Sequence, residues 1–329
     1  MRNSNIECVR FLSMAMIIIL HLIGFGIING YSFAEASVES LSLILIRTLV
    51  GYGVNLFVFI SGYYRIRLSW RSVSKLYFYV VFYQLFLLGT GKYVMDFEMG
   101  GVISCFFPFS HARYWFIQSY FMLMLLSPIL NAAIEHVNWK MVLIPMAILV
   151  FYFGLLFNNP IDDNGFGYFN MIFVYCIAGY VSKCRMRRTI FYVRLWALAL
   201  VLEFAVLYCR YFYNSPLGDS YNNPLNIACA ALLFMIFASL PPRSNKWINH
   251  CALSVFAMYL IHSSACIAPY LYNFITKQFD CYGLGFSIVV VLGLLCSIAV
   301  GSIVVDQVRI YMQQQTFNLL EKICATRKR

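Results

Sequence analysis

Apolar stretches long enough to cross a lipid bilayer recur along the whole chain and limit the folds open to it. A helix needs about 20 mostly apolar residues to cross roughly 30 Å of hydrocarbon, and here 62% of the residues are hydrophobic while only 11% are charged. Inside lipid, every backbone polar group must be satisfied within the structure. The sequence therefore predicts an all-α, polytopic transmembrane helix bundle. Ten spans are expected, at 9–29, 42–63, 74–91, 114–131, 140–157, 168–182, 191–210, 224–240, 252–272 and 284–306.

The placement of basic residues predicts the orientation of this bundle. Ten spans put both termini on one side, together with the loops near 64–75, 132–140, 183–194 and 241–250. That side carries 19 of the 24 Lys and Arg residues. Because cytoplasmic loops carry an excess of Lys and Arg, both termini are expected in the cytoplasm. The net charge of +11 is then a topology signal and does not indicate a nucleic acid partner.

Between the expected spans the loops are short, and no linker, soluble domain or internal repeat is visible. The longest expected outer loop runs from 92 to 113. We therefore treat 1–329 as a single integral-membrane domain, whose chemistry takes place in a cavity that one side of the membrane can reach. The eleven cysteines are scattered singly, without the spacing typical of zinc ligands, so no metal site is expected.

Three polar residues at 7, 10 and 21 share one face of the helix that is expected to form the first span. Arg10 and His21 are eleven residues apart, which on a helix corresponds to three turns plus about 20° and a rise of about 16 Å. The spacing predicts Arg10 near a membrane surface and His21 at depth. Glu7 lies three residues before Arg10 on the same face. An imidazole at bilayer depth is by default a hypothesis for a functional site.

Further ionisable residues lie in later spans. His262 is expected about half-way across the membrane, at a depth similar to that of His21, so the two imidazoles could face one cavity. Glu203 is the only acid in the middle of a span. For each of these residues, a purely structural hydrogen bond between helices is the alternative. Asp306, close to Arg309 at the end of the tenth span, is expected to be a solvated helix terminus.

Four basic residues follow the second span: Arg65, Arg67, Arg71 and Lys75. One interpretation is an anchor that fixes topology and binds anionic lipid head groups. The other is a site for the phosphates of a nucleotide-bearing donor. The charge run alone favours the lipid interpretation.

Four sequence patterns, taken in this order, resemble the integral-membrane acyltransferases of family 3. The first is an arginine, ten residues and a histidine in the first helix, with an acid three residues before the arginine: Glu7, Arg10 and His21. The others are the segment 55–64 with its Ser-Gly pair, the segment 114–130 with Trp-Phe and Ser-Pro, and Tyr-Leu-Ile-His at 259–262. The resemblance covers essentially the whole chain.

Two positions depart from the family pattern. Asn55 stands where a proline is common, and Arg113 lies two residues before the tryptophan, where a histidine is frequent. A histidine, His111, is nearby but shifted. The helix patterns persist despite these departures, whereas the outer loop differs from the family.

The resemblance implies transfer of an acyl group, most often acetyl, from cytoplasmic acyl-CoA. The acceptor it implies is a hydroxyl of a bacterial surface polysaccharide or of its lipid-linked precursor, and the location is the inner membrane. His21 would act as general base or as carrier of the acyl group. His262 would supply a second proton-transfer group or an oxyanion donor. The outer cations Arg47, Arg113 and Arg210 would suit an anionic glycan.

The donor side of the expected site is basic. Arg10 would hold a phosphate of CoA, with Glu7 orienting it, and further phosphate contacts would come from Arg65, Arg67 and Arg71. The pantetheine arm would then extend along the helix stripe toward His21.

A second class of function stays open at this point. A polytopic transporter, flippase or polymerase of surface glycans could use His21, Glu203 and His262 as a polar relay. Binding of a CoA thioester distinguishes the two, because only the acyltransferase requires it.

Overall fold

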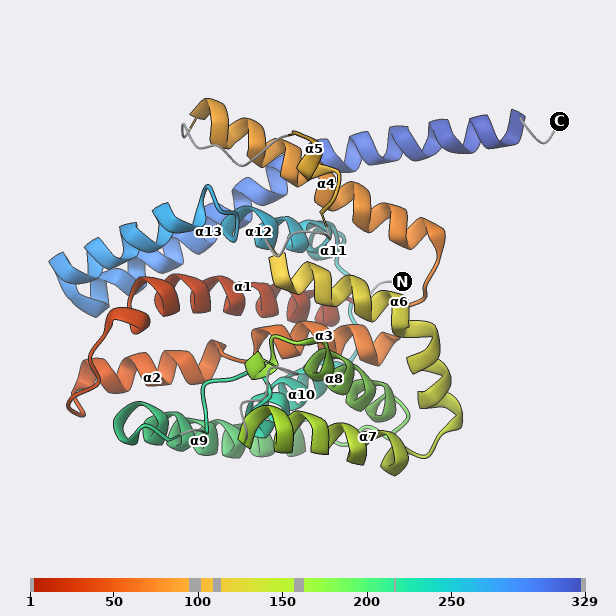
Figure 1. Cartoon of the computed structure of the whole chain (residues 1–329). Coiled ribbons are helices and arrows are strands. Elements are labelled where there is room, and N and C mark those ends of the chain that lie inside the picture. Colours follow the sequence, from red (N-terminus) through yellow and green to blue (C-terminus); the bar gives the residue numbers. More distant parts are fainter. Residues whose placement is uncertain (1–2, 95–101, 109–113, 157–162, 216, 327–329) are drawn as a thin grey trace.

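The computed structural model describes residues 3–94, 102–108, 114–156, 163–215 and 217–326, and every regular element among these residues is helical (Figure 1). The all-α prediction is thus confirmed. The longer helices are α1 (Ser4–Gly26), α2 (Val38–Val50), α3 (Gly53–Tyr64), α4 (Trp70–Val94), α6 (Trp115–His136), α7 (Trp139–Ala147), α8 (Tyr168–Val181), α9 (Thr189–Tyr213), α10 (Pro224–Ala238), α12 (Val255–His262) and α13 (Ala268–Thr326). Shorter elements are η1 (Ile28–Gly30), α5 (Val102–Cys105), the π-helical η3 (Ile148–Leu156), η4 (Asp163–Gly165), α11 (Lys246–Cys251) and η5 (Ala252–Ser254).

Among the described residues, six segments are long and apolar enough to cross a membrane: Ser4–Gly30, Val38–Tyr64, Trp70–Lys92, Trp115–His136, Thr189–Tyr213 and Ala268–Glu321. Three shorter apolar helices coincide with the fifth, sixth and eighth expected spans: Trp139–Tyr152, Tyr168–Val181 and Pro224–Ala238. The expected number of ten, and the side on which the termini lie, stay predictions. Within α13 the backbone reverses at Gly283, whose φ of 75° suits a residue without a Cβ. The two halves of α13 therefore fold back on each other, as the left of Figure 1 shows.

Two of the expected spans are interrupted. The expected span at 42–63 breaks between α2 and α3 at Gly51 and Tyr52. A Cβ on Gly51 would lie 2.8 Å from the carbonyl oxygen of Arg47 and 3.1 Å from its Nη1, so glycine leaves room for that guanidinium. The expected span at 252–272 breaks between α12 and α13, where the hydroxyl of Ser264 donates to the carbonyl of Ile261 at 2.8 Å.

Helix α1 occupies the middle of the bundle, with α12 and α13 on one side and α2 and α3 on the other (Figure 1). It also contacts α10. Its start is tied to the segment before α12: the backbone N–H of Ser4 donates to the carbonyl of Arg243 at 2.7 Å, and the N–H of Asn245 donates to Ser4 Oγ at 2.7 Å. The central helix is therefore fixed against the segment that leads into α12.

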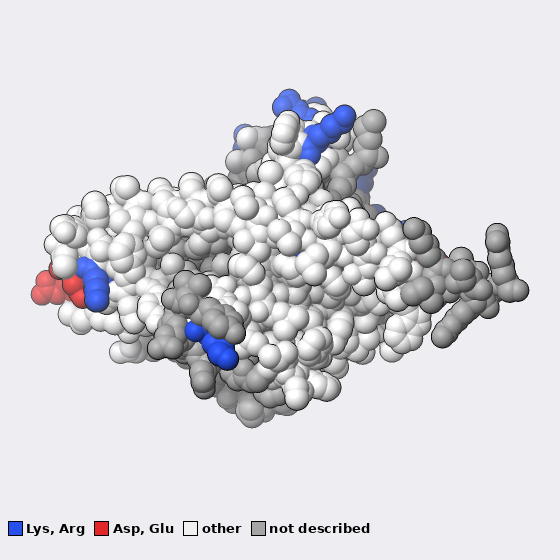
Figure 2. All heavy atoms as spheres, turned by 90° about the horizontal axis from the view of Figure 1, so that it is seen from above, with Lys and Arg blue, Asp and Glu red and all other residues white. Residues whose placement is uncertain are grey.

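The outer surface of the bundle carries broad uncharged areas. Seen from above, most of the described surface is uncharged, with Lys and Arg side chains at the top, at the left end and in the lower middle of the view, and Asp and Glu side chains at the left end (Figure 2). Large apolar side chains that are exposed include Ile129 in α6, Val201 in α9, and Val289, Val300 and Val304 in α13. Such surfaces suit contact with lipid tails, as expected of a multi-pass membrane protein.

Candidate active site

His21 and His262 meet across the boundary between α1 and α12. Nδ1 of His21 lies 3.0 Å from Nε2 of His262, and the ring centroids are 5.1 Å apart. His262 is fully buried, whereas His21 is half-buried. The two imidazoles that the sequence placed at one depth therefore form a hydrogen-bonded pair.

Hydrogen-bond partners assign the tautomers of this pair. Nδ1 of His262 lies 2.6 Å from the carbonyl oxygen of Met258, which can only accept, so this nitrogen carries the proton. Nε2 of a neutral His262 is then an acceptor, and it receives hydrogen bonds from His21 Nδ1 and from the hydroxyl of Ser263 at 3.1 Å. The proton of neutral His21 thus sits on Nδ1, and its Nε2 keeps a lone pair that accepts no hydrogen bond from the described residues.

The register of α1 against the segment 245–262 brings these rings together. Ser4 contacts Asn245 and His21 contacts His262, and each pair is separated by 241 residues in the sequence. The two segments therefore run side by side in the same direction. The anchor at Ser4 holds His21 level with the end of α12.

His21 forms part of the wall of a cavity of about 360 Å³. Three aromatic rings of that wall contact one another: Trp115 lies 4.8 Å from Phe166 and 5.9 Å from Tyr221, and Phe166 lies 5.0 Å from Tyr221, between centroids. The other residues that line it are Leu20, Gly24, Phe25, Ile28, Asn29, Arg47, Tyr211, Asp219, Tyr259, Ser263 and Tyr272. This volume lies in the range of small-molecule sites.

Arg10 and Glu7 form the ion pair that their spacing predicts. Nη1 of Arg10 lies 2.5 Å from a carboxylate oxygen of Glu7, with the arginine side chain 26% exposed and the glutamate side chain 5% exposed. Arg10 does not reach the cavity of His21. It lines a separate cavity of about 370 Å³ together with Ser61, Tyr64, Arg65 and Arg67, among others.

A larger cavity of about 780 Å³ lies next to the one at Arg10. It includes Arg71, Lys75 and Arg309, and both cavities are lined by Ser72, Leu76 and Tyr120. We call the two together the basic groove. The four arginines that are expected to bind a phosphate-bearing donor thus lie along one groove: Arg10, Arg65, Arg67 and Arg71.

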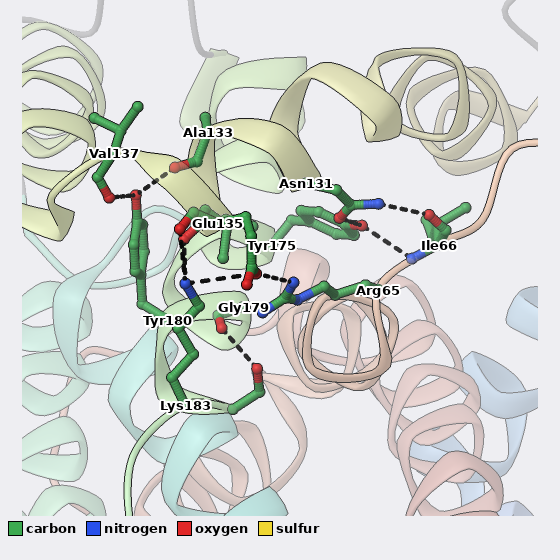
Figure 3. A network of polar contacts seen from close by, with 12 residues as sticks. Arg65, Ile66, Asn131, Ala133, Glu135, Val137, Tyr175, Gly179, Tyr180 and Lys183 are labelled. Carbon is green, nitrogen blue, oxygen red and sulfur yellow. Dashed lines mark hydrogen bonds and ion pairs between the residues drawn. The ribbon is translucent and has the colours of Figure 1, made fainter.

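These arginines differ in how far they are already paired. Arg65 donates to Glu135 at 2.7 Å, and Glu135 also faces Lys183 at 3.6 Å, within the polar network of Figure 3. Arg71 lies 3.3 Å from Glu321 at the surface. In the described part of the chain, the guanidinium of Arg67 has no ion pair or hydrogen bond.

The same network fixes the chain after α3. Tyr175 of α8 accepts from the backbone N–H of Ile66 at 2.9 Å and donates to Asn131 at 2.8 Å, and Asn131 donates to the carbonyl of Ile66 at 2.8 Å. Figure 3 shows these groups converging on the segment at Arg65. The lip of the basic groove is thus held by α6 and α8.

Glu203 lies apart from the histidine pair. It is buried and accepts from Asn223 Nδ2 at 2.9 Å, and it does not line the cavity of His21. The described residues therefore place His21 and His262 together but do not extend the pair to Glu203, as a three-residue relay would require.

Asn55, which departs from the family pattern, is the centre of a buried amide cluster. Its Nδ2 donates to the carbonyl of Tyr221 and to Asn226 Oδ1, both at 2.7 Å, and its Oδ1 accepts from Asn170 at 3.1 Å.

The hydroxyl of Ser61, in the Ser-Gly pair of the family pattern, donates to the carbonyl of Phe57 in the same helix. The other departures, His111 and Arg113, lie outside the described residues.

Two ion pairs were not anticipated as pairs. Arg47 of α2 contacts Asp219, with Nε 2.6 Å from the carboxylate, inside the cavity of His21.

The expectation that Asp306 is a solvated terminus is wrong: Asp306 is fully buried and accepts two hydrogen bonds from Arg309, at 2.7 and 2.8 Å. The spacing of three residues on a helix could have indicated that Asp306 and Arg309 form a pair. The burial of Asp306 depends on packing against α4, which the spacing does not report.

Comparison with known protein families matches residues 3–306 to an acyltransferase domain. This match covers nearly the whole chain, including the histidine pair and the amide cluster. It also includes the basic groove, apart from Arg309 and the groove residues that follow it. Among curated proteins and among solved structures, no significant match is found.

Proposed function

The chain belongs to the acyltransferase family 3 of integral membrane proteins, and we propose that it transfers an acyl group, most often acetyl, from acyl-CoA to a glycan hydroxyl. The acceptor in this proposal is a cell-surface polysaccharide or its lipid-linked precursor. The observation that carries the proposal is the free Nε2 of His21 at the wall of a small-molecule cavity.

His21 acts as the general base in this proposal. Its Nε2 takes the proton of the acceptor hydroxyl, and the oxygen attacks the thioester carbonyl. The C–S bond then breaks, and the departing CoA thiolate takes the proton back from His21. His262 holds the imidazole in the tautomer that makes this possible, as the orienting partner of a catalytic histidine does.

The same free nitrogen also suits attack on the thioester by His21 itself. An acyl-imidazole would then form as CoA leaves, and the acceptor hydroxyl would take the acyl group in a second step. Trapping a labelled acyl group on His21 in the absence of acceptor distinguishes this covalent route from direct transfer.

The basic groove is the proposed donor site. CoA carries phosphate groups, and guanidinium groups bind phosphate by charge-assisted hydrogen bonds. The unpaired Arg67 is the main contact, whereas Arg10 and Arg65 each have one guanidinium nitrogen bound to a carboxylate, that of Glu7 and that of Glu135. Phe116 packs against Tyr120 of the groove and against Tyr259 of the His21 cavity, at 5.9 and 5.6 Å. Rotation of these rings would open the route for the pantetheine arm.

Ten membrane crossings with both termini in the cytoplasm complete the proposal. The positive-inside rule supports this orientation, which turns the basic groove toward cytoplasmic acyl-CoA. The His21 cavity is lined by Asn29, after α1, and by Tyr211, near the end of α9, at the opposite end of the bundle. In a bacterial inner membrane, the acceptor would enter from that end.

A strain comparison tests the proposal. The O-acyl content of surface glycans is measured by NMR in a deletion strain that carries no copy, the wild-type chain, His21→Ala or the matched control His250→Ala. His250 is exposed and contacts Gln307, away from the cavity. Acylation that returns with the wild type and the control but not with His21→Ala, at equal membrane abundance, supports the proposal. Equal acylation by His21→Ala rejects the mechanism.

A further inference from the structure

We propose that the part of the His21 cavity lined by Arg47, Asp219 and three aromatic rings binds an uncharged pyranose, in preference to an acidic sugar. This inference deepens the proposed function by specifying its acceptor, and it rests on that function only for the role of the sugar. It follows from the charge balance, the unused hydrogen-bonding capacity and the shape of the cavity wall.

The cation in the cavity is already neutralised. Asp219 is bound by Arg47 through both Nε and Nη2, and its second oxygen accepts from the hydroxyl of Tyr211 at 2.8 Å. Arg210, the other outer cation that is described, donates to the carbonyl of Ser215 and does not line this cavity. The described lining therefore contains one positive and one negative side chain, which argues against the anionic glycan that the outer cations alone would suit.

The pair keeps hydrogen-bonding capacity that a polyhydroxylated ligand can use. Nη1 of Arg47 is buried and has no hydrogen-bond partner among the described residues. A carboxylate offers about four acceptor positions, of which the partners of Asp219 use only some. Sugar hydroxyls can donate to the unused acceptor positions of Asp219, whose side chain is 30% exposed, and a turn of the Arg47 guanidinium away from Gly51 would let a neighbouring hydroxyl accept from Nη1. A carboxylate on the ligand would instead bring a net negative charge into a partly desolvated site, which is costly.

The aromatic wall matches the other side of a sugar ring. Flat apolar faces that can pack on the C–H groups of a pyranose come from Trp115, Phe166 and Tyr221. The indole N–H of Trp115 and the hydroxyl of Tyr221 can also form hydrogen bonds. Burial raises the pKa of Tyr221 to about 12, so its phenol remains a neutral donor at physiological pH.

The amide cluster holds this wall in place. The carbonyl of Tyr221 accepts from Asn55, and its N–H donates to the carbonyl of Asn164 at 3.1 Å. The departure of Asn55 from the family pattern is thus connected, through one backbone group, to the ring that faces the proposed acceptor. This links a feature particular to the present chain with the part of the cavity that would select the sugar.

Saturation-transfer NMR on the full chain in lipid nanodiscs, without acyl-CoA, tests the inference. The neutral probes are methyl β-D-glucopyranoside and methyl β-D-galactopyranoside, and the acidic probes are glucuronic acid and N-acetylneuraminic acid. The wild type should bind at least one neutral probe about tenfold more tightly than either acidic probe. Equal or tighter binding of the acidic probes, or no binding of any neutral probe, octyl β-D-glucopyranoside included, overturns the inference.

Charge variants supply an independent arm. Asp219→Asn leaves Arg47 without its counter-charge, so the preference should shift about tenfold toward the acidic probes. The double variant Arg47→Gln, Asp219→Asn removes both charges and should restore the preference for neutral probes. Lys277→Gln removes an exposed positive charge outside the cavity and should behave as wild type. An unchanged ratio in Asp219→Asn contradicts the proposal. If that variant does not fold, the wild-type ratio and the double variant still decide.

Two further readouts separate related outcomes. Acetyl-CoA binding is measured by calorimetry on the same preparation. Sugar binding without acetyl-CoA binding rejects the proposed function but not the subsite, whereas acetyl-CoA binding without sugar binding rejects the subsite alone. The source of the sugar is tested by comparing octyl β-D-glucopyranoside with the methyl glycoside, and counting only a signal that Asp219→Asn abolishes. Such a signal with the octyl glycoside alone indicates a lipid-linked sugar, whereas equal signals from both indicate a free or polymer-borne sugar. Either result supports recognition of the pyranose.

Discussion

Nδ1 of His21 donates to Nε2 of His262 over 3.0 Å, and this one contact determines which nitrogen of His21 is free to react. The direction of the hydrogen bond follows from the carbonyl of Met258, which fixes the proton of His262 on Nδ1. We therefore propose His262 as a positioning residue. It does not line the cavity of His21, so in the proposed mechanism it would act through His21 and would not contact the acceptor.

Removing the acceptor atom at position 262 should lower kcat without changing the KM for acetyl-CoA. His262→Phe cannot accept from His21, and we expect kcat to fall about 100-fold. The amide oxygen of His262→Gln can accept, so this variant should retain about ten times more activity than His262→Phe. Steady-state kinetics in nanodiscs measure both, with His250→Gln as the control. Equal kcat values for the two variants would reject positioning by a hydrogen bond.

Arg67 and Arg65 should respond differently to loss of charge, although both lie in the basic groove. Arg67→Gln removes a proposed phosphate contact and should raise the Kd for acetyl-CoA at least about tenfold, since charge-assisted hydrogen bonds contribute about 1.5–3 kcal/mol. Arg65→Gln removes the pair with Glu135 and should change that Kd less than about threefold. Calorimetry at two salt concentrations measures both constants. A larger effect of Arg65→Gln would place the phosphates elsewhere.

The buried pair of Asp306 and Arg309 should be needed as a pair. Asp306 also accepts from Tyr83 and Ser254, each at 2.9 Å, and the guanidinium of Arg309 lies 4.0 Å from the ring centroid of Tyr79. Arg309→Met leaves a buried carboxylate without its cation, which costs about 3–5 kcal/mol. The double variant Asp306→Asn, Arg309→Met should regain most of that loss. The fraction of monodisperse protein after heating reports it, and a double variant no more stable than Arg309→Met contradicts the argument.

How far the sequence predicts this molecule depends on whether a feature is local. The spacing of Glu7, Arg10 and His21 fixes their relation along one helix. The depth argument put His21 and His262 at one level, where they form a hydrogen bond, but only His21 lines the cavity that both were expected to face. Sequence could not show that Arg65 is paired with Glu135, because that contact spans 70 residues and depends on how α6 packs. The pairing of Arg47 with Asp219, 172 residues apart, was invisible for the same reason. The breaks at Gly51 and after His262 were missed because hydropathy does not report where a helix is interrupted.

Asn55 should be more important for stability than a typical interior asparagine. Replacing it with alanine removes one hydrogen bond each from the carbonyl of Tyr221, Oδ1 of Asn226 and Nδ2 of Asn170, and a buried group that is left unsatisfied costs about 1–3 kcal/mol. We expect Asn55→Ala to lower the Tm by several degrees and to weaken binding of neutral sugars, because Tyr221 is released. Size-exclusion thermal assays measure the first effect. Gln315→Ala, at an exposed position of α13, should leave the Tm unchanged. An unchanged Tm in Asn55→Ala would mean that water replaces the lost amide.

Gly62 should tolerate no side chain, although it carries no chemistry of its own. A Cβ there would lie 2.5 Å from the carbonyl oxygen of Tyr175 and 2.8 Å from its Cα, so α3 and α8 would have to move apart. That movement would break the hydrogen bond between Ile66 and Tyr175 and shift the lip of the basic groove. Overpacking costs about 1–3 kcal/mol, so Gly62→Ala should lower both the Tm and the affinity for acetyl-CoA. Gly89→Ala, where a Cβ meets nothing within 4 Å, is the matched control and should change neither. Equal behaviour of the two variants would mean that α3 and α8 are not in such close contact in the membrane.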